Sequence, residues 1–293
     1  MLRARCFLWV VGALMATPAF GAVQFLASDG DELFRADSTG SVLAPITLSH
    51  PIQSLTVVPG GFSLPGTSGG DVIAARHSPV SGQWGVYRVD DPFGAAPTLT
   101  QIGATSFGVG SMVFAGADIY AVNDSLSPIR VSRLNPLDFS VIQTWNTGIS
   151  ASGGGGIAWD PVGSRFLLTN YTANTLVSWT PSAGATTIGP IGFGFSNNGI
   201  ELHNGTLYGA LRPDSAGTTL RLGSFNLTTG AFTTLATATG IAGNGTGFVA
   251  IPEPQTAVML ALGAACIARR RRCAGCRSGR CCAPRCATAS ETQ

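Results

Sequence analysis

The sequence predicts an all-β fold, a β-propeller of five four-stranded blades that is closed by pairing the two ends of the domain. The 293 residues include 39 Gly and 17 Pro and only 11% charged residues, which argues against a coiled coil or a helix-rich domain. The chain is 45% hydrophobic, so it is too apolar for a disordered protein. Five segments of the middle region also begin alike, at the spacing of propeller blades.

Each of these five segments starts with Ser or Gly followed by a large apolar residue. Counted from that apolar residue, the starts are separated by 57, 45, 43 and 48 residues. Propeller blades repeat at about 40–50 residues, so we assign each segment to an inner strand. The segments are Ser54-Leu-Thr-Val-Val58, Ser111-Met-Val-Phe114, Gly156-Ile-Ala-Trp159, Gly199-Ile-Glu-Leu202 and Gly247-Phe-Val-Ala250.

A tight turn and further strands follow each start except the fifth. Asp160-Pro-Val-Gly-Ser164 precedes an apolar stretch over 165–170, and the turn supplies the positive φ that a hairpin requires. Third and fourth strands are expected over 175–179 and 185–188. The Asp160-Pro-Val-Gly stretch is also similar to the hairpin of NHL-type and lactonase-like propellers, which supports the fold alone.

The fifth start, at 247–250, has no strands after it, whereas three strands without an inner partner are expected at 23–27, 32–36 and 42–46. Joining one C-terminal strand to these three N-terminal strands completes a fifth blade and removes two open sheet edges. A β-sandwich is the alternative for a chain of many short strands.

The N-terminus has the pattern of a signal peptide over residues 1–21. Arg3 and Arg5 precede an apolar run that ends near Met15, and small residues follow. We expect a signal helix here and cleavage by signal peptidase after Gly21, with Ala22 as the alternative position. The body, residues 22–250, contains no Cys, as suits an exported protein.

The C-terminal part predicts a sorting signal over residues 251–272. The tripeptide Pro252, Glu253, Pro254 precedes an apolar run over 256–268 and a basic cluster. The apolar run of about 13 residues is shorter than the roughly 20 needed for a full span, so we expect a short hydrophobic helix that anchors the chain transiently in the inner membrane. The basic cluster that follows it consists of Arg269, Arg270, Arg271 and Arg272.

This arrangement resembles the PEP-CTERM sorting signal of exopolysaccharide-producing Gram-negative bacteria. The resemblance implies processing by an exosortase near the tripeptide and delivery to the envelope or the extracellular medium. It covers only the C-terminal segment and implies nothing about the activity of the body.

Residues 273–293 extend past the point at which such chains usually end. Cys273 and Cys276 have the spacing of zinc ligands, but no second pair follows at the appropriate distance. We therefore expect a disordered Cys- and Arg-rich tail that leaves with the sorting peptide, with a zinc knuckle as the alternative.

The charge distribution argues against a nucleic-acid partner. Between residues 22 and 250 the sequence has eight Arg and 13 acidic residues, a net charge of −5, and no Lys occurs anywhere. The positive charge is concentrated at the ends, and the body has no basic stripe.

Four polar residues are candidates for the mouth of the central channel, and none has a matching ligand on the other blades. The positions equivalent to Glu201 are Thr56, Val113, Ala158 and Val249, which are small or mostly apolar. The sequence therefore predicts no catalytic residue, no metal and no cofactor. The four candidates are Asp160, Asn170, Glu201 and His203.

Together these features predict an exported surface or matrix protein with a non-catalytic binding or structural role. A surface rich in Ser, Thr, Asn and Gly suits exopolysaccharide in a biofilm, or another surface protein. The alternative is a secreted propeller enzyme that resembles a lactonase or a glycosidase.

Overall fold

The computed structural model describes residues 23–76, 84–123, 126–150, 155–213, 218–239 and 246–251. The chain divides into two compact units, residues 1–252 and 253–293, and the described residues belong to the first. The predicted signal peptide (1–21), the sorting segment beyond Ile251 and the tail (273–293) lie outside the described residues, as do the two helices predicted there.

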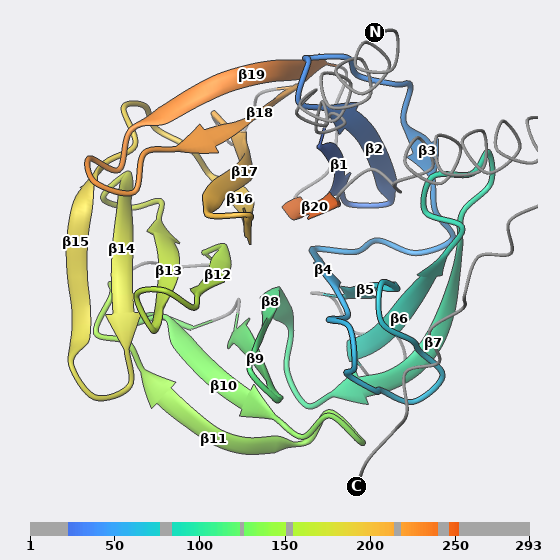
Figure 1. Cartoon of the computed structure of the whole chain (residues 1–293), viewed down its shortest axis with the longest axis horizontal. Helices are drawn as coiled ribbons and strands as arrows, with labels where there is room; N and C mark the ends of the chain where they lie inside the picture. The colour runs from blue at the N-terminus through green and yellow to red at the C-terminus, as the bar shows by residue number, and fades with distance from the viewer. Residues whose placement is uncertain are drawn as a thin grey trace, which may run out of the picture. The chain divides into compact units, whose positions relative to one another are not determined.

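The described residues form five separate antiparallel sheets of four strands each. Figure 1 shows these sheets arranged around a common centre, with β20, β4, β8, β12 and β16 innermost. This arrangement confirms the predicted five-bladed propeller and excludes the β-sandwich, in which two sheets pack face to face.

In each blade the four strands lie side by side, and the first one named below is nearest the centre and the last forms the rim. Blade 1 contains β20 (Thr246–Ile251), β1 (Gln24–Asp29), β2 (Glu32–Asp37) and β3 (Ile46–Thr47). Blade 2 contains β4 (Ser54–Val57), β5 (Val72–Ala75), β6 (Trp84–Asp90) and β7 (Thr98–Thr105). Blade 3 contains β8 (Val109–Ala115), β9 (Asp118–Asn123), β10 (Arg130–Leu134) and β11 (Val141–Asn146).

The last two blades follow the same order. Blade 4 contains β12 (Ile157–Asp160), β13 (Arg165–Asn170), β14 (Thr175–Thr180) and β15 (Gly184–Pro190). Blade 5 contains β16 (Asn197–His203), β17 (Thr206–Arg212), β18 (Thr219–Phe225) and β19 (Phe232–Thr239).

Blade 1 closes the ring as the sequence predicts. The C-terminal strand β20 pairs with the N-terminal strand β1, with Ala27 opposite Phe248. The Gly247 amide also donates a hydrogen bond to Ser28 Oγ (3.0 Å), and this hydroxyl donates to the Ile52 carbonyl (3.2 Å). The closing strands are thereby tied to the segment that leads into blade 2.

The outer strand of blade 1 is shorter than predicted. A strand was expected over 42–46, but β3 contains only Ile46 and Thr47, and Val42 forms an isolated bridge to Ala36. Pro45 lies between these two pairings and has no N–H to donate, so the ladder is interrupted there.

The five inner strands can converge because each has a very small residue at or near its start, and we call these five residues the collar. A Cβ placed on Gly199 would lie 2.6 Å from the Phe248 backbone nitrogen, and one on Gly247 would lie 2.9 Å from the Leu55 nitrogen. Real Cβ atoms essentially never approach so closely. The collar consists of Ser54, Ser111, Gly156, Gly199 and Gly247.

Two collar contacts are supplemented by hydrogen bonds between blades. The Gly156 amide donates to Asn198 Oδ1 of blade 5 (2.6 Å), which also accepts a hydrogen bond from the Thr169 hydroxyl. The Ile157 amide donates to Ser111 Oγ of blade 3 (3.2 Å). Since residues at or near the starts of neighbouring inner strands lie in contact, all five strands begin at the same end of the channel, which we call the upstream end.

The hydrophobic core is divided among the five seams between neighbouring blades. Between blades 5 and 1, Phe25 packs on Phe248 and Tyr208 with ring centroids 5.5 and 5.1 Å apart. Between blades 3 and 4, Phe166 and Trp179 lie 5.5 Å apart. Each fully buried large side chain contributes about 1.5–3 kcal/mol, so every blade depends on both of its neighbours.

The collar predicts that a single added methyl group strongly lowers the stability of the fold. Gly199→Ala should lower the free energy of unfolding by about 3 kcal/mol, because the new Cβ meets backbone atoms that cannot move aside. Thermal or denaturant unfolding of the secreted protein measures this change. Gly60→Ala is the matched control, because a Cβ there meets nothing within 4 Å. Equal stability of the two variants would contradict close convergence of the inner strands.

Candidate functional site

The four polar residues predicted for the channel mouth do not come together. Asp160 ends β12 and pairs with Arg165, whereas Asn170 ends the antiparallel neighbour β13. The two residues therefore lie at opposite ends of blade 4, with Asn170 at the upstream end. Glu201 and His203 share β16 and approach its downstream end.

Asp160 is held in a turn. Its Oδ1 accepts hydrogen bonds from the amides of Val162 (3.1 Å) and Gly163 (3.0 Å), and its Oδ2 lies 2.9 Å from Arg165 Nε. Burial acts to raise the pKa of Asp160, but these amides and the Arg165 guanidinium outweigh it and hold the pKa below its usual value. The carboxylate thus stabilises the β12–β13 turn.

Asn170 has a similar local contact at the opposite end of the blade. Its Oδ1 accepts a hydrogen bond from the Ala173 amide (3.1 Å), which shapes the β13–β14 turn. His203 Nε2 lies 3.0 Å from Asn204 Nδ2, and burial lowers the pKa of His203.

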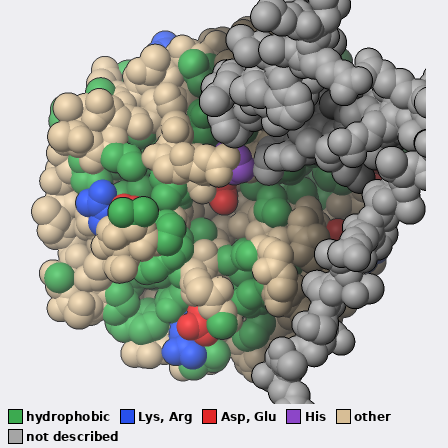
Figure 2. Space-filling view, viewed as in Figure 1, with side chains coloured by type: hydrophobic (Ala, Val, Ile, Leu, Met, Phe, Trp, Pro, Cys, Tyr) green, Lys and Arg blue, Asp and Glu red, His purple; other side chains and the backbone are tan. Residues whose placement is uncertain are grey.

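Glu201 differs from the other three because one carboxylate oxygen has no local partner. The side chain is partly accessible as a whole, but Oε2 is enclosed and has no hydrogen bond within the described part of the chain. Burial raises the pKa of Glu201 to about 8. Figure 2 shows few charged side chains on the described part of the face that it draws.

Sequence reasoning overlooked a set of polar residues at the upstream end. The second strand of every blade is followed by, or ends in, a polar residue at this end, and we call the five residues the upstream belt. Only Asn170 was among the predicted candidates. The belt consists of Asp29, Arg76, Asn123, Asn170 and Arg212.

Three members of the upstream belt are buried charged residues. Asp29 and Arg212 form an ion pair of 3.7 Å, with side chains 0% and 5% exposed. The whole of Arg76 is only 5% exposed. Buried charges are rare unless they are paired or functional, so this end of the channel is the stronger candidate site. The signal in the sequence is the recurrence of Asp, Arg or Asn at the end of each second strand or directly after it.

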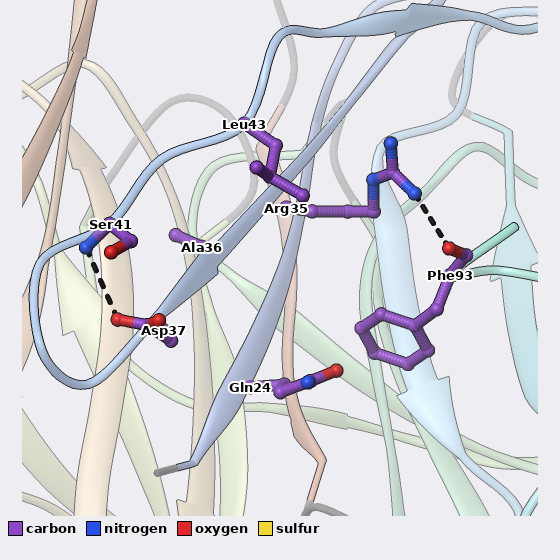
Figure 3. A pocket seen from close by; sticks show the side chains of 7 residues that line it. All are labelled: Gln24, Arg35, Ala36, Asp37, Ser41, Leu43 and Phe93. Atoms are coloured by element: carbon purple, nitrogen blue, oxygen red, sulfur yellow. Dashed lines mark hydrogen bonds between the residues drawn. The ribbon is translucent and has the colours of Figure 1, made fainter. Parts of the chain in front are cut away.

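A small surface pocket lies between blade 1 and the β6–β7 loop (Figure 3). Its volume is about 210 Å³, below the range of about 300–1,000 Å³ typical of ligand pockets. The Arg35 guanidinium donates to the carbonyls of Phe93 (2.7 Å) and Gly94 (2.9 Å). Asp37 accepts from the Ser41 amide (3.1 Å). Because it is small, and because Arg35 Nη1 and the Asp37 carboxylate are engaged within the fold, this pocket is a weaker candidate than the upstream belt.

Within the described ranges, no group of three or more His, Cys, Asp or Glu side chains is arranged to hold a metal ion. No helix within those ranges is long and apolar enough to cross a membrane.

The fold and the C-terminal sequence define a five-bladed β-propeller that carries a sorting signal. The family of the PEP-CTERM protein-sorting motif matches residues 250–272, which confirms the predicted resemblance at Pro252, Glu253 and Pro254. This motif implies that the protein is exported and sorted to the cell surface with processing by an exosortase.

Comparisons with other proteins add no specific function. No curated protein matches the chain. A chain in the structure of a nidogen/laminin complex is 13% identical with a TM-score of 0.42, covering 77% of this chain and 98% of that one. A putative 6-phosphogluconolactonase from Bacteroides fragilis is 14% identical with a TM-score of 0.35, covering 76% of this chain and 69% of that one. Likenesses this weak do not bear on function.

The sorting motif predicts the mass of the mature protein. The secreted form should lack residues 273–293, because the tripeptide Pro252-Glu253-Pro254 precedes the segment removed by an exosortase. Intact-mass spectrometry of secreted material measures this directly. Replacing the three residues of the tripeptide by Ala should leave the C-terminal segment attached. A secreted wild-type protein that retains its Cys-rich tail would contradict the prediction.

The enclosed carboxyl group of Glu201 predicts a pH-dependent stability. Its pKa rises from 4.5 to about 8 on folding, so the folded protein retains a proton that the unfolded chain releases. The free energy of unfolding should therefore fall between about pH 5 and 8, by up to about 4 kcal/mol. Glu201→Gln should remove this fall and be the more stable protein at pH 8 or above.

Denaturant unfolding at several pH values measures both curves. Asp138→Asn is a suitable control, because a hydrogen bond from Ser140 lowers the pKa of this exposed carboxyl and leaves it ionised over the same range. Parallel curves for the wild type and Glu201→Gln would contradict burial of the Glu201 carboxyl.

Proposed function

We propose that the propeller is a non-catalytic binding module of the cell surface or extracellular matrix, and that its partner is exopolysaccharide. The sorting motif supports a location outside the cell. The observation that carries the binding role is the chemistry of the outer strands, which form most of the rim.

The four long outer strands carry no charged residue, and each of them contains at least one threonine. Hydroxyl and amide groups can exchange hydrogen bonds with sugar hydroxyls without any counter-ion. A rim of this kind therefore suits an extended, hydroxyl-rich polymer. The strands are β7, β11, β15 and β19.

Each of these strands also carries one β-bulge. The register against the third strand shifts once in every case, and a large aliphatic residue occupies the extra position. Bulges disrupt the edge ladder and prevent edge-to-edge pairing between molecules. The rim can thus stay uncharged without pairing to a second copy. The extra residues are Ile102, Ile142, Ile188 and Leu235.

The alternative is a secreted lactonase- or glycosidase-like enzyme. Such an enzyme needs polar groups from several blades to converge on one atom of the substrate. The separation of Asp160 from Asn170 and the role of Asp160 in a turn favour the binding function.

The proposal predicts that the secreted protein binds the exopolysaccharide of its own producer and leaves it intact. Co-sedimentation with the purified polymer should retain the protein, and size-exclusion chromatography of the polymer should show no loss of chain length. A cellulose suspension processed in parallel controls for non-specific trapping. Shortening of the polymer or release of hydrolysis products would support the enzyme instead, and absence of binding would contradict the proposal.

A further inference from the structure

Blade 1 differs from the other four blades at its rim. Its outer strand β3 has only two residues, whereas β7, β11, β15 and β19 have six to eight. The segment 41–43 beside the end of β2 is not a strand, although the Asp37 amide donates to the Ser41 carbonyl (3.0 Å) and the Leu43 amide to the Arg35 carbonyl (2.8 Å). The surface pocket of Figure 3 lies at this irregular edge.

The strand register brings polar side chains of the pocket to one face of blade 1. Gln24 of β1 lies directly opposite Asp37 of β2, and Arg35 precedes Asp37 by two residues. Opposed residues, and residues two apart in a strand, point to the same face of a sheet. Leu33 is also on this face, and it shares a buried cluster with Val72 of blade 2. The pocket therefore opens on the side of blade 1 that faces blade 2.

An aromatic ring from blade 2 forms the opposite wall of the pocket. Phe93 belongs to the β6–β7 loop and is 37% exposed. Blade 1 holds this loop in place, since Arg35 Nη1 donates to the carbonyls of Phe93 (2.7 Å) and Gly94 (2.9 Å). In Figure 3 the ring is turned toward the pocket, with Asp37 on the other side. A ring that is held in place and stays accessible loses little freedom when a ligand packs on it.

Asp37 is engaged within the fold through one carboxylate oxygen. Its Oδ1 accepts hydrogen bonds from the Thr39 amide (2.8 Å), the Thr39 hydroxyl and the Ser41 amide (3.1 Å). The bond from the Thr39 hydroxyl is the main cause that holds the pKa of Asp37 below its usual value, so the group is ionised at neutral pH. Because these hydrogen bonds from the described residues all go to Oδ1, Oδ2 can accept a hydrogen bond from a ligand.

The small size of the pocket and the engagement of Arg35 Nη1 argue against a bulky or anionic ligand. The same properties suit a single pyranose ring, whose C–H groups form an apolar face and whose hydroxyls lie at its edge. We propose that the pocket binds one uncharged pyranose unit of the exopolysaccharide, with Phe93 against the C–H face and with Asp37 and Gln24 as partners of adjacent hydroxyls. This inference rests on the proposed binding of exopolysaccharide and assigns a site and a sugar class to it.

The experiment uses the secreted, processed protein and the neutral monosaccharides released by complete hydrolysis of the producer's exopolysaccharide. Saturation-transfer NMR should detect binding of at least one of them, with the strongest transfer to the C–H protons of one ring face. Sorbitol has the hydroxyls but no ring, and the carboxylate of sodium glucuronate is repelled by that of Asp37, so both should bind at least fivefold more weakly. Phe93→Ala and Asp37→Asn should each weaken binding of the monosaccharide at least tenfold.

Matched control variants are available on blade 3. Leu137→Ala removes another exposed apolar side chain, which is 73% exposed and does not line the pocket. Asp138→Asn changes a carboxylate whose Oδ1 accepts from the Ser140 amide (3.0 Å) and hydroxyl (2.7 Å), much as Asp37 does from Thr39. Both variants should bind the sugar as the wild type does. If Phe93→Ala does not fold, Phe93→Leu keeps the apolar bulk but loses the flat ring, and should bind at least fivefold more weakly.

The inference is wrong if no neutral monosaccharide binds the wild type, if sorbitol or glucuronate binds equally well, or if the Phe93 and Asp37 variants retain full binding. Co-sedimentation with the intact exopolysaccharide distinguishes it from the broader proposal. Undiminished binding of the polymer by Phe93→Ala would refute the pocket alone, whereas failure of the wild type to bind the polymer would refute the proposed function.

Discussion

The fold depends on the space available where five inner strands begin side by side. The collar positions carry only Ser or Gly, and the positions that follow them carry large apolar residues. Small side chains let neighbouring backbones touch, and the large residues then fill the seams as the blades diverge. The Cβ distances at Gly156, Gly199 and Gly247 show that blades 4, 5 and 1 have no room for a larger residue. The close approach of the five inner strands depends on this constraint.

The collar also separates two chemically different parts of the channel. On the downstream side, Asp160 is engaged in a turn, and the enclosed Glu201 lies among small or apolar equivalents. On the upstream side, the belt concentrates Asp29, Arg76 and Arg212 in buried positions. The rim is different again, with bulged and uncharged outer strands.

The periodic part of this architecture could be predicted from the sequence. A Ser or Gly before a large apolar residue recurs once per blade, so the blade starts and the closure of blade 1 followed from residues alone. Pro45 interrupts the outer strand of that blade, a local effect that the apolar pattern over 42–46 concealed. The bulges at Ile102, Ile142, Ile188 and Leu235 were not predicted, because they are differences in register between paired strands.

The candidate site was only partly predictable for a related reason. Asn170 was found because it follows a clear hairpin, but Arg76 follows a strand whose position within the long second blade was not predicted. The burial of Arg76 is a property of the seam between blades 1 and 2, and no local pattern contains it. Asp160 was a candidate site residue because it is polar and ends an inner strand. Its hydrogen bonds with Gly163 and Arg165 show that it stabilises a turn.

Closure of the ring by its two ends is the central claim, and one engineered disulfide tests it most directly. The body contains no Cys, and Gln24 lies opposite Ile251 in the register of β1 and β20. Gln24→Cys combined with Ile251→Cys should form a disulfide spontaneously in the secreted protein. Gln24→Cys combined with Thr246→Cys should remain reduced, since Thr246 pairs with Asp29 at the other end of the strand. A reduced first pair, or equal oxidation of both pairs, would contradict the closed five-bladed ring.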